Sequence, residues 1–251
     1  DRKKIIKIMK NVDLVIHLAS NADIAKAVKD PLIDYVEGFN LTLNVLEAMR
    51  KNKVKNLIFA SGSGVYEEKY KSMLIENSSN LKPISTYGAN KLSSESFISA
   101  YSHLYNINSL VFRFANVVGK NQTHGVAYDF KNKLIDNSNV IKVMGNGSQT
   151  KSYVDVNDII NATIRAFKKN KKNYDIFNIS NDDRISVKEI LKLVISDLNL
   201  KKKPKIIFGK TTRGWSGDVP FIKLSNKKIK KIGWNYKFNS KEAIINSLKY
   251  I

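Results

Sequence analysis

Apolar and polar residues follow two repeating patterns along the chain: short continuous apolar runs and longer stretches with helical spacing. Residues 13–20 (DLVIHLAS) are typical of a buried strand that ends in small residues. Apolar runs at 56–61 and 109–114 predict two further strands, and residues 33–51 and 87–106 between them have helical spacing. Strands that alternate with helices of this length indicate βαβ units and a parallel sheet.

Small or polar residues follow each predicted strand: Ala19 and Ser20, then Ser61 to Ser63, then Asn116. In an open parallel sheet the carboxyl ends of the strands meet at one edge, where ligands bind. Small side chains there leave room for a ligand. His17 lies inside the first strand, and we interpret it as a packed strand residue rather than a ligand-binding one.

The second half of the chain carries fewer signals. Helical spacing predicts helices over 126–137 and 155–169, and apolar runs predict strands over 140–144, 176–179 and 206–208. Ser186 and Glu189 form the pattern of a capping box, which should open a helix that runs to about residue 198. Trp215 and Trp234 are interpreted as packing residues, with base stacking as the alternative.

Composition excludes several classes of site. The 251 residues are 43% hydrophobic and 10% aromatic, which fits a globular protein with a core. No apolar run approaches the roughly 20 residues that span a bilayer, and no signal-peptide pattern opens the chain, so a cytoplasmic protein is expected. The chain has no cysteine, and its three histidines lie far apart, so neither disulfides nor a metal site are expected.

The formal net charge is +21, and it is uneven. Residues 201–251 contain 14 Lys and Arg against two acids, Asp218 and Glu242. A basic surface attracts polyanions, including nucleic acid. The lysines are spread along segments with ordinary apolar periodicity, however, which favours a general lysine-rich composition over a nucleic-acid site.

Tyr87 and Lys91 are the strongest candidates for chemistry. Four residues apart on a predicted helix, they share one face, so the ammonium is expected to lower the pKa of the phenol. Such a phenol can take the proton of a bound alcohol. In isolation the spacing also fits an ordinary pair on a solvated helix, but the helix starts near the expected ligand edge of the sheet, which favours the catalytic interpretation.

Five motifs in order resemble the extended short-chain dehydrogenase/reductases, and within them the nucleotide-sugar epimerase/dehydratases of the UDP-glucose 4-epimerase type. They are HLA at 17–19, SGSGVY at 61–66, YGANK at 87–91 with Glu95, RFANVVG at 113–119, and GNGSQTKSYVDVND at 145–158. Weaker similarity continues through GDVP at 217–220 and GW at 233–234. The resemblance therefore covers nearly the whole chain.

The resemblance implies an α/β fold with a Rossmann-type, doubly wound parallel sheet and a smaller, discontinuous substrate domain. Residues 1–120 should form the dinucleotide-binding domain, to which 150–182 return, and 121–251 mainly the substrate domain. The implied activity is epimerisation of a nucleoside-diphosphate sugar with NAD as cofactor. The implied assembly is a homodimer through the helices at 33–51 and 87–105, with Phe97, Ile98, Tyr101 and Leu104 as candidate contacts.

Roles carry over residue by residue. The resemblance makes Tyr87 the general base and Lys91 the residue that activates it and holds the nicotinamide ribose. The cofactor should be lined by Leu18, Ala19, Ser20, Ser61, Tyr87, Lys91 and Ala115. Asn116, Lys151 and Asp218 should bind the nucleotide sugar, Lys151 at a position that is usually arginine.

This chain also departs from the family pattern. The glycine-rich phosphate-binding turn is not found, so strands upstream of Asp1 are expected to be missing. The usual catalytic Ser/Thr falls on Gly62, so Ser63, or less well Ser61, is expected to replace it. A usual asparagine falls on Gly38. These departures keep open the alternative of an impaired enzyme that serves as a binding protein, possibly for nucleic acid. The lack of a carboxylate at Ser63-Gly64 favours an epimerase or a simple reductase over a dehydratase.

Overall fold

The computed structural model describes residues 1–251 apart from 22–23, 25, 69–71, 216 and 220. The chain divides into two compact units: Asp1–Tyr70, Leu74–Phe114 and Thr163–Asn178 form the first, and Lys71–Met73, Ala115–Ala162 and Ile179–Ile251 form the second. The expected boundary at residue 120 lies a few residues too late. The reason is that strand β4 (Asn116–Val118) pairs in parallel with β7 (Tyr153–Asp155) of the second unit.

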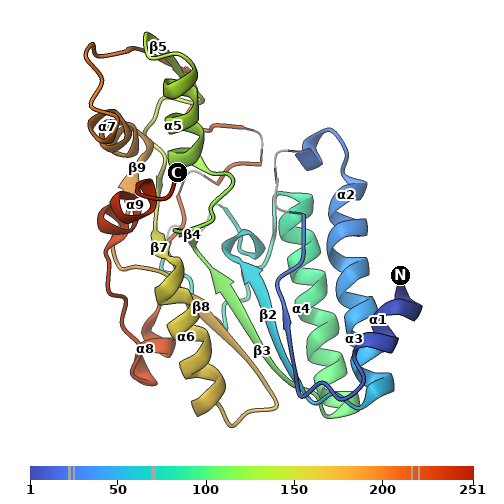
Figure 1. Cartoon of the computed structure of the whole chain (residues 1–251). Helices are drawn as coiled ribbons and strands as arrows, with labels where there is room; N and C mark the ends of the chain where they lie inside the picture. The colour runs from blue at the N-terminus through green and yellow to red at the C-terminus, as the bar shows by residue number, and fades with distance from the viewer. Residues whose placement is uncertain (22–23, 25, 69–71, 216, 220) are drawn as a thin grey trace. The chain divides into compact units, whose positions relative to one another are not determined.

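A sheet of four strands in the order β1-β2-β3-β8 forms the centre of the first unit (Figure 1). Its strands are β1 (Leu14–His17), β2 (Asn56–Gly62), β3 (Asn108–Phe114) and β8 (Tyr174–Ile179). The first three are parallel, with Ile16 opposite Ile58 and Ile58 opposite Leu110. Their carboxyl ends therefore lie at one edge, as the hydrophobic pattern predicted.

The helices of the first unit are α1 (Arg2–Ile8), α3 (Asn40–Asn52), α4 (Thr86–Tyr105) and the second half of α6 (Val156–Lys169). Shorter turns are η1 (Lys26–Val28), α2 (Leu32–Asp34) and η3 (Ser63–Val65). The helix expected over 33–51 is divided, because a π-helical turn, η2 (Tyr35–Phe39), lies between α2 and α3. Ser85 is the N-cap of α4, and its hydroxyl accepts from the Gly88 N–H at 3.1 Å.

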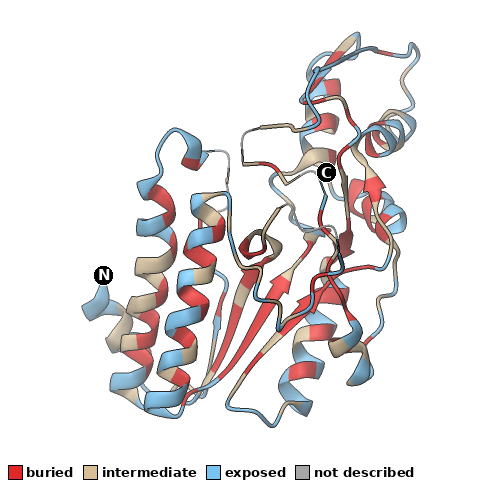
Figure 2. Ribbon diagram, turned by 180° about the vertical axis from the view of Figure 1, so that it is seen from behind, coloured by how far each residue is buried: buried red, intermediate tan, exposed pale blue. Residues whose placement is uncertain are grey.

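Helices α3 and α4 lie side by side against one face of this sheet (Figure 1). The buried residues in Figure 2 follow the strands and the helix faces turned toward them. This core consists of Met9, Val45, Leu46, Ala48, Met49, Val54, Leu57, Phe59, Ile98, Ile107 and Val111. His17 is buried with its ring 5.5 Å from that of Phe59, which confirms that it is a packed strand residue.

The second unit contains three two-stranded sheets. Its strands pair as β4 with β7, β5 (Val140–Val143) with β10 (Lys205–Phe208), and β6 (Thr150–Lys151) with β9 (Ile185–Ser186). Its helices are α5 (Val126–Asp136), the first half of α6 (Val156–Lys169), α7 (Val187–Asp197), α8 (Lys227–Lys231) and α9 (Ser240–Leu248). The predicted capping box at Ser186 and Glu189 is confirmed.

The core of the second unit joins α5, α7 and α9 to β5 and β7. Its buried residues include Phe130, Leu134, Ile141, Val143, Tyr153, Ile190, Leu191, Val194, Ile244 and Leu248. Trp234 is also buried and donates its indole N–H to the Asp158 carbonyl at 3.0 Å. Its interpretation as a packing residue is therefore confirmed.

Candidate functional site

Helix α4 presents Tyr87 and Lys91 to the carboxyl end of β2. The Lys91 side chain is buried, and its Nζ donates to the Ala60 carbonyl at 2.8 Å. The same Nζ lies 5.5 Å from the centre of the Tyr87 ring and 5.1 Å from that of Phe59. The structure thus brings together the two residues that the sequence singled out, and it fixes the lysine on the strand end.

The electrostatics of this pair differ from the expectation. Burial, together with the smaller effect of the nearby Asp34 carboxylate, raises the pKa of Tyr87 to about 12. Burial lowers the pKa of Lys91 to about 8, against the opposing effect of Asp34 and Glu95. The prediction that Lys91 lowers the pKa of Tyr87 is therefore wrong for this arrangement. Loss of hydration is the main cause of the raised pKa of Tyr87, and the Lys91 ammonium is directed to the Ala60 carbonyl.

Asp34 is a site residue that the sequence analysis missed. Its carboxylate is buried and accepts from Thr86 Oγ1 at 2.7 Å and from Asn21 Nδ2 at 2.9 Å. It therefore ties α2 to the first turn of α4, next to Tyr87. The sequence did contain a signal for this residue, because Asp34 stands between Ile33 and Tyr35 in a helical stretch. A carboxylate buried at such a position needs hydrogen-bond partners.

Three neighbouring positions at the end of β2 have different surroundings. Ser61 is buried and donates to Glu95 Oε1 at 2.5 Å, away from the phenol. Ser63 opens the turn η3 and is half-buried. A Cβ at Gly62 would lie 3.6 Å from Tyr87 Oη, so a side chain at position 62 would face the phenol hydroxyl.

Leu18, Ala19 and Ser20 follow β1 at the same edge of the sheet. Leu18 and Ala19 are exposed, and Ser20 Oγ lies 3.5 Å from Asn90 Nδ2 on α4. An exposed strand end with small residues, beside a buried lysine and an amide, fits the cofactor that the resemblance implied. The residues of the first unit therefore fit NAD, which Leu18 to Ser20 and Lys91 would hold.

The remaining candidate residues belong to the second unit. Lys151 Nζ forms an ion pair with Asp218 Oδ1 at 2.6 Å, and Asp218 Oδ2 accepts from the Gly214 N–H at 3.0 Å. Arg213, which the sequence analysis missed, donates from Nη1 to the Asp218 carbonyl at 3.1 Å. The structure thus joins the expected phosphate-binding cation to the expected ribose-binding acid.

Two further candidates lie where β3 gives way to β4: Asn116 begins β4, and Ala115 lies between the two strands. Asn116 Nδ2 donates to the Ser152 carbonyl at 3.2 Å, and the Ala115 N–H donates to the Ile179 carbonyl at 2.9 Å. Both belong to the second unit, whereas Tyr87, Lys91 and Ser63 belong to the first.

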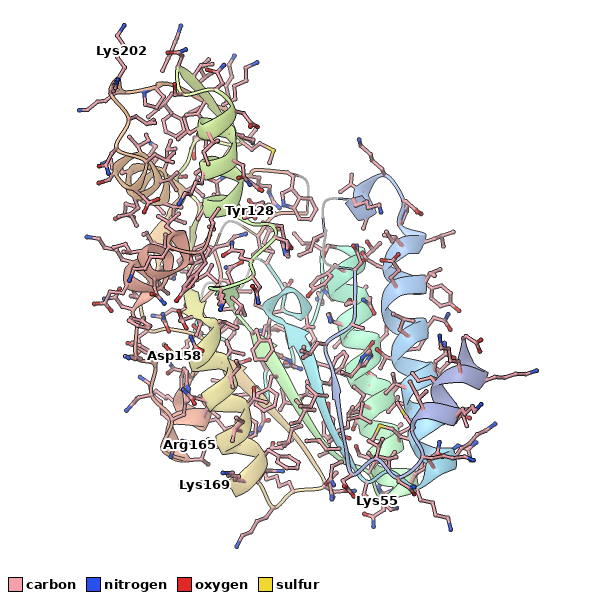
Figure 3. The ribbon with its side chains drawn as sticks, viewed as in Figure 1. Lys55, Tyr128, Asp158, Arg165, Lys169 and Lys202 are labelled. Atoms are coloured by element: carbon pink, nitrogen blue, oxygen red, sulfur yellow. The ribbon has the colours of Figure 1, made fainter. Side chains whose placement is uncertain are left out.

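Exposed cations come from separate segments of the chain. Figure 3 labels Lys55, which follows α3, Arg165 and Lys169 on α6, and Lys202 before β10. All four are exposed.

In the part of the chain that the structure describes, no helix is both long and apolar enough to cross a membrane.

Comparisons with known proteins agree with this arrangement. The model of the NAD dependent epimerase/dehydratase family matches residues 1–180. A putative UDP-glucose 4-epimerase of Methanocaldococcus jannaschii is 30% identical over 239 residues, which are 94% of this chain and 75% of the relative.

Two solved structures share the fold along the whole chain. One is a UDP-glucose 4-epimerase of Thermotoga maritima with UDP-glucose (28% identity, TM-score 0.88), and the other a UDP-glucose 4-epimerase of Thermus thermophilus in complex with NAD (25% identity, TM-score 0.87). The alignment covers 100% of this chain and 81% of each structure. The parallel sheet is thus that of the Rossmann-fold epimerases, and NAD is the cofactor of the family. The chain belongs to the NAD dependent epimerase/dehydratase family.

Proposed function

We propose that this protein is an NAD-dependent 4-epimerase of a UDP-sugar. The observation that carries the proposal is the Tyr87–Lys91 pair at the end of β2, with Lys91 anchored on Ala60 and the Tyr87 hydroxyl facing Gly62. The names of the related proteins support a UDP-sugar as the substrate class.

Each residue has a defined task in this proposal. When bound, NAD supplies the acceptance and return of a hydride. Tyr87 Oη takes the proton of the sugar hydroxyl and later returns it. Lys91 keeps a positive charge beside the phenol, and Ser63 is the proposed source of the hydroxyl that Gly62 does not provide.

The second unit holds the substrate in this proposal. Asn116 and Lys151 bind the diphosphate, and Asp218 binds the nucleoside ribose. Lys151 is a point charge rather than the bidentate fork of an arginine, so its contact with phosphate is less directional. Its ion pair with Asp218 has to open for both residues to bind the substrate.

An epimerase accounts for the site better than a dehydratase, since the positions after Gly62 are Ser63 and Gly64 and supply no carboxylate. The comparisons do not favour the alternative of a nucleic-acid-binding protein. The test is incubation of the protein and NAD with UDP-glucose, UDP-galactose, UDP-N-acetylglucosamine and UDP-glucuronate, followed by NMR of the sugar. Inversion at C4 of at least one of them is expected. No change in any, or loss of water to a keto-deoxy sugar, would contradict the proposal.

A further inference from the structure

A π-helical turn interrupts the helical segment opposite α4. The turn η2 spans Tyr35–Phe39 and contains Gly38, which is buried. Single π turns inside helices are costly and often mark functional sites. Gly38 is not among the glycines with positive φ, so backbone freedom does not explain why glycine occupies this position.

The space beside Gly38 is filled by the side chain of Asn90. A Cβ at Gly38 would lie 2.0 Å from Asn90 Nδ2, 2.4 Å from its Cγ and 2.5 Å from its Oδ1. Atoms do not approach this closely, so a side chain at 38 would require the Asn90 amide to leave its present position. The amide of Asn90 thus occupies the region that a side chain at position 38 would enter, where the family resemblance leads us to expect an asparagine.

The amide belongs to a buried row of polar groups. Ser94 Oγ lies 3.5 Å from Asn90 Oδ1 and 3.3 Å from Thr42 Oγ1, and Thr42 Oγ1 lies 3.0 Å from His17 Nε2. At the other end, Asn90 Nδ2 lies 3.5 Å from Ser20 Oγ. Both contacts of the amide are at the long limit for hydrogen bonds, although an amide offers two donors and one carbonyl oxygen.

We propose that Asn90 is a positioning residue of the cofactor site, and that Gly38 in the π turn η2 leaves the space that its side chain occupies. The amide comes from α4, and the opposite segment provides the room for it at Gly38. From there Asn90 supports Ser20 at the end of β1 and directly precedes Lys91, so it acts on NAD through both. This inference rests on the proposed function, because it assigns Asn90 to the NAD site.

The test is a double-substitution cycle read by NAD affinity in calorimetry and by thermal melting. Asn90→Ser should keep Tm near that of the parent but weaken NAD binding about tenfold, the effect of losing one hydrogen-bonding group. Gly38→Asn alone should lower Tm strongly, because two amides compete for one space. Gly38→Asn combined with Asn90→Ser should recover both Tm and NAD affinity. Ser96→Ala is the control, since Ser96 is exposed on the same helix and donates to the Leu92 carbonyl, so its loss should change neither quantity.

The inference is overturned if the double variant shows only the sum of the two single losses, if Asn90→Ser binds NAD as the parent does, or if the parent binds no NAD. A failure of the proposed function gives a different pattern. In that case the double variant still recovers Tm and NAD affinity, but the protein does not invert C4 of any of the UDP-sugars.

Discussion

At the scale of single residues, the adjacent positions 61, 62 and 63 at the end of β2 have different surroundings. Ser61 faces Glu95, Gly62 faces the Tyr87 hydroxyl, and Ser63 begins the next turn. A hydroxyl that assists Tyr87 therefore belongs most naturally at position 62. The sequence identified this position, but only the structure shows that Ser61 is held elsewhere.

Gly62→Ser is expected to raise the epimerase rate. Gly62 has an extended backbone, with φ −152°, and a Cβ would make an ordinary 3.6 Å contact with Tyr87 Oη, so serine fits without strain. Its hydroxyl can then hydrogen-bond the phenol or the sugar oxygen, which is expected to be worth roughly tenfold or more in kcat. Gly62→Ala is the control and should give no increase. An equal rate for the glycine and serine proteins would show that the position does not assist the reaction.

His17 makes the stability of the protein depend on pH. Burial lowers its pKa to about 4, and the charge of Lys91 contributes. The folded state therefore binds the proton more weakly than the unfolded state, whose histidine titrates near 6.5. The free energy of unfolding should fall as the pH drops from about 6.5 to 4, because the unfolded state binds more protons in that range.

His17→Gln should make this acid loss of stability shallower, since glutamine can still bond Thr42 but does not titrate. The measurement is urea unfolding at several pH values between 4 and 7. His124→Gln, at an exposed position, should leave the slope as in the parent. A slope unchanged by His17→Gln would rule out this origin.

At the scale of elements, a buried ion pair joins α4 to β3. Glu95 Oε2 lies 2.6 Å from Arg113 Nη2, and both side chains are almost fully buried. Arg113 Nη1 also donates to Tyr66 Oη at 2.8 Å, and the Tyr66 hydroxyl donates to Asn178 Oδ1 at 2.8 Å. Together with the bond from Ser61, this network sets the position of α4, and so of Tyr87, on the sheet.

Glu95→Gln should destabilise the protein by about 3–5 kcal/mol, because it leaves Arg113 charged and buried without its counterion. Glu47→Gln is the matched control. Its partners Arg50 and Tyr101 are partly exposed, so the loss should be much smaller than that of Glu95→Gln. Free energies of unfolding from urea titration give both values. Equal losses for the two variants would mean that burial does not determine the contribution of the pair.

Most elements could be predicted from the sequence, because their apolar period is clear. The three parallel strands, helix α4 and the capping box at Ser186 all lie within a few residues of the prediction. The π turn at 35–39 could not be predicted, since the apolar spacing runs through it without a break. The direction of the pKa shift of Tyr87 could not be predicted from the sequence either, because it depends on burial and on Asp34, which is distant in the chain.

At the scale of the whole molecule, the first unit carries an apolar helical surface on α2, η2 and α4. Leu32, Tyr35, Val36, Phe97 and Leu104 are between 41% and 69% exposed. One of the expected contacts is corrected, because Ile98 is fully buried in the core, whereas Tyr101 is partly exposed and donates its hydroxyl to Glu47 at 2.8 Å. We propose that the exposed surface forms an isologous homodimer contact.

Light scattering at micromolar concentration should therefore show a dimer. Phe97→Glu or Leu104→Glu should produce a folded monomer with unchanged circular dichroism, because a charge cannot be buried unpaired in the contact. Ile164→Glu on α6 is the control, as Ile164 is equally exposed but lies on another helix. A parent protein that is monomeric at these concentrations would refute the dimer.

The account depends most on Tyr87 as the residue that moves the proton, and one substitution tests this directly. Tyr87→Phe keeps the ring and removes the hydroxyl, so the rate of C4 inversion should fall at least about a hundredfold while Tm stays close to that of the parent. Tyr101→Phe, which removes a hydroxyl from the same helix, should leave the rate within the error of the parent. A Tyr87→Phe protein with near-normal epimerase activity would contradict the account.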